Sequence, residues 1–143
     1  MFGWGRKKDL MVVEAVCSKI RPLFGILENR LGGLPPLLLD DPYVIGYVVG
    51  SAVIFAQIET DGRATTELRG LVSLSAIQAA FASLNIGMQQ ASTAMQIMAA
   101  HPEGKRGGNA ADLVIGAAMG KTDRDSEPEI VVIVQNPIRV KSE

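Results

Sequence analysis

Apolar residues recur every three or four positions along most of this chain, a spacing that predicts amphipathic helices. The longest stripe predicts one helix that opens at Thr65 or Thr66 and ends before Pro102. Its apolar members are Leu74, Ile77, Phe81, Leu84, Met88, Ala91, Met95 and Met98. Gly70 and Gly87 each weaken this helix by about 1 kcal/mol relative to Ala, so the helix could bend or break near Asn85.

No charged residue occurs from Gly70 to Pro102, although 20% of the chain is charged. A helix face that is left to water normally carries charges, and depletion of charge is typical of an interface core. We therefore expect the neutral second face of this helix to pair with protein, most simply with a second copy of the chain in a two-fold dimer. The candidate interface residues on it are Gln78, Gln89, Gln90, Ser92 and Gln96.

Another helix is predicted ahead of this one, with Asp9 as its N-cap and an apolar stripe that continues to Leu31. Pro22 falls inside the stripe and predicts a kink or two short helices. Gly32 and Gly33 end it. Residues 1–8 are then a flexible terminus, and residues 34–40 an extended apolar connector over the core.

Asp41 followed by Pro42 is a strong helix-start signal, an acidic N-cap before a proline at the first helical position. The helix that it opens runs to Glu59 and is apolar on nearly every side, which is typical of a central buried helix. Gly46 and Gly50 allow a neighbouring backbone to approach closely. The segment is also near the lower length limit for a membrane span. Its acidic flanks favour the core of a soluble domain instead.

Beyond Pro102 the composition changes to glycine and charge, and then to β-branched residues. Residues 103–108 and 121–129 are predicted to be mobile loops, with a short helix from 110 to 119 that Asn109 caps. A short strand is predicted within residues 130–141, and it must pair with its own continuation or with a second chain. The candidate interface residues there are Ile130, Val132 and Val134.

The fold class that follows is mainly α: one compact helical domain over residues 1–143, with a long uncharged central helix and a short C-terminal β segment. A net charge of −1 gives no general field for nucleic acid. Cys17 is the single cysteine, so an intrachain disulfide is excluded, and a buried thiol in a reducing, cytoplasmic protein is expected.

Two segments near the C-terminus resemble ligand-binding loops, but each departs from the pattern that the loop requires. The run from Leu113 to Thr122 looks like a strand entering a phosphate-binding loop, but Gly116 and Gly120 enclose one residue too few. A helix of small residues closed by glycine is favoured. The acidic alternation from Asp123 to Glu129 has the spacing of a calcium loop but has proline at the turn position, so a solvated linker is favoured.

Two further clusters could bind ligands. Met88, Met95, Met98 and His101 offer soft ligands for Cu(I), although methionines on a helical stripe usually fill core gaps. A second candidate is an anion site ahead of the helix capped by Asn109, since helix N-termini attract anions. Its residues are Lys105, Arg106 and Asn109. We expect no metal and no cofactor.

The N-terminus places Phe2 and Trp4 beside three cations at positions 6–8. This could form a membrane-surface anchor, although a solvated terminus is favoured. The charges that follow, beginning with Asp9, exclude a secretory signal.

No nucleophile, base and orienting group cluster in the sequence, which argues against an enzyme. The function expected is that of a non-enzymatic, self-associating interaction or scaffold protein, a homodimer in the first instance, with another protein as a further partner. The alternative is a small-ligand or enzymatic domain that binds a phosphate-containing ligand near residues 105–122. A membrane-surface protein is third.

Overall fold

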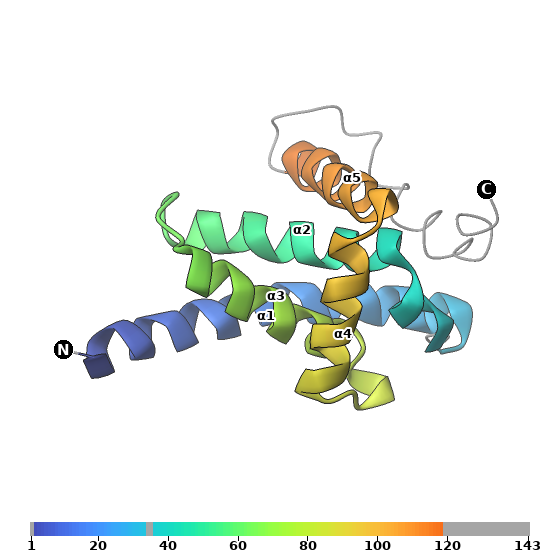
Figure 1. The fold of residues 1–143 in the computed structure, drawn as a ribbon, viewed down its shortest axis with the longest axis horizontal. Coiled ribbons are helices and arrows are strands. Elements are labelled where there is room, and N and C mark those ends of the chain that lie inside the picture. The colour runs from blue at the N-terminus through green and yellow to red at the C-terminus, as the bar shows by residue number, and fades with distance from the viewer. Residues whose placement is uncertain (1, 34–35, 119–143) are drawn as a thin grey trace.

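The computed structural model describes residues 2–33 and 36–118. These residues form five α-helices and two short 3-10 helices, and no strand occurs among them (Figure 1). The elements are α1 (Phe2–Leu31), η1 (Pro36–Asp40), α2 (Pro42–Glu59), α3 (Thr66–Ala80), η2 (Ala82–Leu84), α4 (Met88–Ala99) and α5 (Pro102–Ala118). The predicted mainly α class is confirmed for this part of the chain. The predicted linker 121–129 and the strand segment 130–141 lie outside the described residues.

The helix α2 lies at the centre of the bundle, between α5 on one side and α1 and α3 on the other (Figure 1). The predicted cap is confirmed, because Asp41 Oδ1 accepts a hydrogen bond of 2.9 Å from the backbone N–H of Tyr43. Every residue from Pro42 to Val48 is buried. The prediction of a central buried helix with these bounds is therefore confirmed.

One helix of the described residues, Pro42–Glu59, is long and apolar enough to cross a membrane. More than half of this segment, 56%, is buried inside the bundle. A core helix of a folded domain passes the same test of length and composition. Its burial among the other helices is sufficient to explain its apolar composition.

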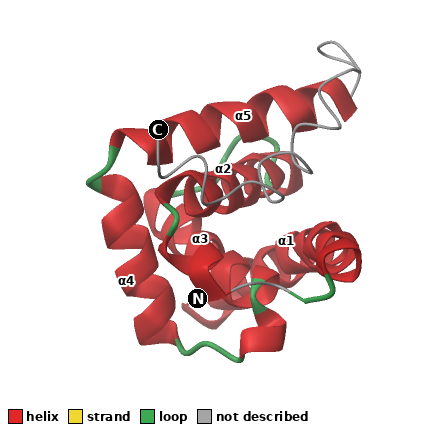
Figure 2. Cartoon of the chain, turned by 90° about the vertical axis from the view of Figure 1, so that its right-hand side faces the viewer, coloured by secondary structure: helices red, strands yellow, loops and turns green. Residues whose placement is uncertain are grey.

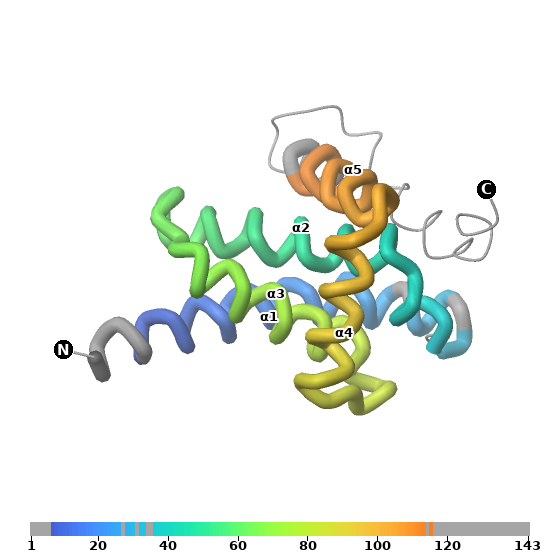
Figure 3. Tube along the Cα trace, viewed as in Figure 1, coloured from blue at the N-terminus to red at the C-terminus, as the bar shows by residue number. Residues whose placement is uncertain are grey.

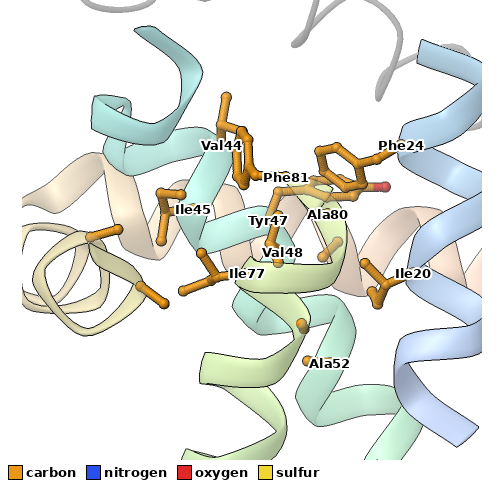
Figure 4. Close-up of a cluster of buried hydrophobic side chains, with 14 of the residues drawn as sticks. Ile20, Phe24, Val44, Ile45, Tyr47, Val48, Ala52, Ile77, Ala80 and Phe81 are labelled. Atoms are coloured by element: carbon orange, nitrogen blue, oxygen red, sulfur yellow. The ribbon is translucent and has the colours of Figure 1, made fainter. Parts of the chain in front are cut away.

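The core lies where α1, α2 and α3 meet (Figure 4). Phe24 of α1 and Phe81 after α3 place their ring centroids 6.1 Å apart at an interplanar angle of 48°, a tilted pair. Phe81 is fully buried, and so are Ile20 and Ile77 around it. Each such side chain contributes about 1.5–3 kcal/mol by leaving water, so this cluster is the main stabilising element of the fold.

The helix α1 begins earlier than predicted and continues without interruption. It starts at Phe2, so the expected cap at Asp9 is wrong, and residues 2–8 of the segment that was expected to be a flexible terminus are helical. Residues 2–8 contain no proline, and their lysines and arginine favour a helix, although Gly3 and Gly5 weaken it. The predicted split at Pro22 is also wrong: Pro22 is exposed, so water can reach the Ser18 carbonyl that loses its partner.

The end of α1 is as predicted. Gly32 has φ of +73°, and the N–H of Gly33 donates to the carbonyl of Glu28 at 2.8 Å, which closes the last turn. The connector that follows is not extended over residues 36–40 but wound into η1. Winding turns Leu38 into the core, where it is fully buried, and lets its carbonyl accept from the N–H of Asp41 at 3.2 Å.

The long central helix is wrong as a single element, because the chain reverses between Phe81 and Gly87. The break falls at Asn85, whose φ of 53° is left-handed. A straight helix from Thr66 to Ala99 would extend about 50 Å and leave the bundle. The reversal keeps Phe81 in the core and returns α4 to pack against α2 and α3. The predicted start at Thr65 or Thr66 is confirmed, with Thr65 as the N-cap and Thr66 as the first helical residue.

Residues 103–108 were expected to form a loop, and they form the first turns of α5 instead. The chain changes direction after α4 (Figure 3), and α5 starts at Pro102. Nδ1 of His101 accepts from the N–H of Glu103 at 3.2 Å, so His101 takes the capping role expected of Asn109. Asn109 lies inside α5, and its predicted role as a cap is wrong.

The glycines of α5 explain why this segment is helical. A methyl group at Gly46 of α2 would fall on the carbonyl oxygen of Gly104, and one at Gly107 would fall on the carbonyl oxygen of Tyr43. A methyl group at Gly50 would lie 2.9 Å from Cα of Gly108. The backbones of α2 and α5 therefore touch, and their contact compensates for the low helix propensity of glycine.

Candidate interaction surface

The reversal at Asn85 places α4 at the edge of the bundle, with one side against the other helices and the opposite side facing away (Figure 2). Ala91 and Ala94 on the inner side are buried, and Met95 and Met98 pack partly buried against the core. The small alanines let the helix approach closely while the flexible methionines fill the remaining gaps. The expected core role of Met95 and Met98 is confirmed, whereas Met88 is exposed.

The opposite side, which we call the α4 outer face, carries no charge. It consists of Met88, Gln89, Thr93, Gln96 and Ile97, all of them exposed. Met88 and Ile97 are large apolar side chains with exposed fractions of 47% and 43%. They flank the neutral polar residues, so apolar area and uncharged hydrogen-bonding groups occur on one continuous surface.

Other helices expose charge in the same situation. The exposed side of α5 includes Lys105, Arg106 and Asp112, and that of α3 includes Glu67 and Arg69. Charges of both signs are typical of a helix face in contact with water. The α4 outer face differs from these two helices in lacking them, which is typical of the central part of a protein interface.

Four of the predicted interface residues lie on α4, whereas Gln78 lies on α3. Gln89 and Gln96 lie on the α4 outer face, Gln90 is exposed at its edge and Ser92 is half-buried. Gln90 also accepts from the N–H of Gly87 at 2.9 Å through Oε1. Gln78 lies on α3, and its Nε2 donates to the carbonyl of Ile86 at 3.3 Å, so its structural role is to hold the turn into α4. The others, Ile130, Val132 and Val134, lie outside the described residues.

The anion site predicted at Lys105, Arg106 and Asn109 loses its basis. All three residues are exposed on α5, but no helix begins at Asn109. Nη1 of Arg106 lies 2.7 and 2.9 Å from the two carboxylate oxygens of Glu103, and its guanidinium carbon is 5.6 Å from the ring centroid of Tyr43. The guanidinium therefore already pairs with a carboxylate and packs on an aromatic ring.

Two further kinds of chemical site were considered, a reactive thiol and a metal site. Cys17 is buried as predicted, and this burial raises the pKa of its thiol, which Glu14 reinforces and Arg21 partly offsets. A protonated, buried thiol is a poor nucleophile. No group of three or more His, Cys, Asp or Glu that could hold a metal ion occurs among the described residues.

The resemblance to a phosphate-binding loop begins inside a helix rather than a strand. Residues 113–118 form the last turns of α5, as the preferred small-residue helix predicted. Residues 119–122 and the acidic alternation from Asp123 to Glu129 lie outside the described residues. A phosphate loop requires a strand before the first glycine, so the described half of the motif does not fit.

Comparison of the chain with protein family models, with curated proteins and with solved structures gives no match. Its function is therefore inferred from its own surface and packing.

Proposed function

We propose that this protein is a non-enzymatic helical domain that associates with a second copy of itself through the α4 outer face. The observation that carries this proposal is the absence of charge on an exposed helix that presents Met88 and Ile97 to solvent. Exposure of these apolar side chains to water is unfavourable, and pairing with the same face of a second copy would take them out of water. A two-fold axis is the commonest way to close such an assembly.

The size of the surface limits the strength of the assembly. The helix α4 has 12 residues and is therefore about 18 Å long. Such a patch is smaller than the roughly 800 Å² that each partner buries in a standard interface. We expect a reversible dimer that forms at tens of micromolar protein, not a permanent one. Exposed residues next to α4, such as Ala82 and Ser83 of η2, could enlarge the contact.

The test is the solution mass of the protein at tens of micromolar, by light scattering and sedimentation, with Gln89→Glu as the variant. A carboxylate on each α4 outer face would lose its water in the interface without gaining a partner of opposite charge, and this desolvation would weaken the dimer. Gln89 lies in the first turn of α4, where negative charge favours the helix, so the fold is preserved.

The matched control is Asn109→Asp, which makes the same change from amide to carboxylate on the exposed side of α5. We expect it to dimerise like the wild type. A monomeric wild type at these concentrations would refute self-association. Equal loss in both variants would show that net charge, and not the α4 outer face, controls the assembly.

A cytoplasmic location is part of the same proposal, because Cys17 is a free, buried thiol. A phosphate-binding function near residues 105–122 is not favoured by any contact of the described residues. The third alternative, attachment to a membrane surface, rests on a different part of the molecule and on observations of its own.

A further inference from the structure

The N-terminal end of α1, which we define as residues 2–11, combines cations with exposed apolar side chains. Arg6, Lys7 and Lys8 follow each other in the sequence, and the side chains of Lys7 and Lys8 are exposed. Leu10 and Met11 come directly after them with exposed fractions of 56% and 66%. These two have the highest exposure among the exposed large hydrophobic residues of the described chain.

Residues 7–11 contribute little to the core, because none of them is buried. Among the residues of α1 whose side chains are described, the buried ones begin at Val16. The helix is also about 45 Å long against about 27 Å for α2, from 1.5 Å per residue. Figure 1 shows its first turns extending beyond the ends of α2 and α3. Packing inside the protein therefore does not explain Leu10 and Met11.

Helix stability does not explain the cations either. The first turn of α1 contains no acidic residue, and the three cations come in the next turn. They add to the positive end of the helix dipole, where cations are unfavourable. Asp9 follows them in the same turn and offsets one of the three positive charges. Glu14, one turn further on, lies 3.4 Å from Arg21. The result is a positive end of the helix that suits an anionic partner.

We propose that residues 2–11 bind the surface of an anionic lipid membrane. Lysine and arginine near such a surface attract lipid phosphates, and adjacent apolar side chains enter the boundary between headgroups and acyl chains. Helix residues three or four positions apart share a face, so Leu10 and Met11 lie on the same side as Lys7, with Lys8 at its edge and Asp9 outside it. A face that combines cations with apolar side chains is the arrangement that interfacial helices use. The contact is peripheral and leaves α2 inside the bundle.

The segment also contains the only tryptophan, Trp4, which reports its environment directly. The experiment mixes the full-length protein with vesicles of phosphatidylcholine alone or with about 30% phosphatidylglycerol, and measures flotation and Trp4 emission. We expect binding and a blue shift only with the anionic vesicles. Binding should decrease as salt rises from about 0.1 M to about 0.5 M, because the charges are screened.

The variant is Lys7→Glu with Met11→Ser. We expect it to lose at least about tenfold in vesicle affinity, since it removes a cation and the most exposed apolar side chain. Its matched control is Arg30→Glu with Ile26→Ser, which changes the same residue classes at the same spacing at the other end of α1. Ile26 is 54% exposed, and Arg30 is exposed in the last turn. This control should bind like the wild type, and circular dichroism should show α1 intact in both proteins.

Several results would overturn the proposal: no flotation with anionic vesicles, equal binding to neutral vesicles, or equal loss in the control. Binding to polyglutamate with comparable affinity and without a blue shift would assign the segment to an acidic protein and would also reject the lipid. The Gln89→Glu variant should keep its membrane binding, so failure of either proposal leaves the other standing.

Discussion

At the scale of single residues, burial changes the acid–base chemistry of Cys17. Its side chain is 4% exposed, and this desolvation raises the pKa of the thiol in the folded state. The unfolded chain then loses the thiol proton at a lower pH than the folded chain does. Neutral Cys17 therefore contributes stability below the pKa of the unfolded chain, and this contribution is lost as the pH rises.

We predict that the stability gap between the wild type and Cys17→Ala narrows from about pH 7 to about pH 10. The wild type should be more stable at neutral pH, because alanine leaves a small cavity at this buried position. Thermal unfolding of both proteins across the pH series measures the gap, and the comparison isolates Cys17 because the two proteins differ only there. A gap that is constant with pH would show that the thiol does not titrate differently in the two states.

Single residues also show which positions the sequence could assign. The N-caps Asp41 and Thr65 were predictable because each contacts the N–H of a residue two or three positions away. His101 was not, because its role as a cap depends on where α5 begins. Gln78 was assigned to the outer surface, whereas in the structure it bonds to Ile86 across a reversal that the stripe of apolar residues does not show.

At the scale of elements, the contact between α2 and α5 depends on glycine on both helices. Gly46 and Gly50 on α2 repeat the spacing of Gly104 and Gly108 on α5. The two pairs face each other so closely that an added methyl group at Gly46 or Gly50 would strike the backbone of α5. The backbone cannot rotate out of the way as a side chain can, so an added methyl group would force the two helices apart.

We predict that Gly46→Ala lowers the free energy of unfolding by about 3 kcal/mol, at the upper end of overpacking. Gly50→Ala should cost less, because its methyl group would meet Cα of Gly108 at 2.9 Å. The control is Gly70→Ala in the middle of α3, where nothing lies within 4 Å, and it should stabilise the protein by about 0.5–1 kcal/mol. Urea unfolding measures the free energy of unfolding of the three variants. A Gly46→Ala protein as stable as the wild type would show that α2 and α5 do not cross this closely.

The contact between α2 and α5 also shows why the helix at residues 103–108 could not be predicted from the local sequence. The glycine-rich segment 103–108 was interpreted as a mobile loop because glycine lowers helix propensity locally. Its helical state is fixed by a partner helix far away in the chain, and local composition cannot show that. The matching spacing of the glycine pairs on the two segments was the available signal. The sequence also indicated a break of the uncharged helix near Asn85, but it did not show that the chain reverses there and keeps Phe81 in the core.

At the scale of the whole molecule, the five helices divide the surface by chemistry. The glycine contact buries one side of α5, and its exposed side carries Lys105, Arg106 and Asp112. The edge formed by α4 is neutral and partly apolar, and the end of α1 is cationic. A domain of this kind can join a second copy at one edge and still present another end to a different partner. The proposed dimer therefore makes a geometric prediction about α4.

If two copies pair through α4 in antiparallel fashion, the two-fold axis passes near the middle of the α4 outer face, at Thr93. Packed helices lie about 8–10 Å apart, so outward residues next to the axis bring their Cα atoms within the distance that a disulfide spans. We predict that Thr93→Cys forms an intermolecular disulfide rapidly under mild oxidation at tens of micromolar. Denaturing electrophoresis without reductant measures the covalent dimer.

The native Cys17 does not interfere in this assay, because it is buried with a raised thiol pKa. Asn109→Cys is the control: it places an equally exposed thiol on α5, away from the axis, and should cross-link only slowly through random collisions. Adding Gln89→Glu to Thr93→Cys should reduce the cross-linking, because a carboxylate that is desolvated in the interface weakens the pairing that brings the two thiols together. Equal rates for Thr93→Cys and Asn109→Cys would show that collision alone joins the chains and that α4 does not pair with itself.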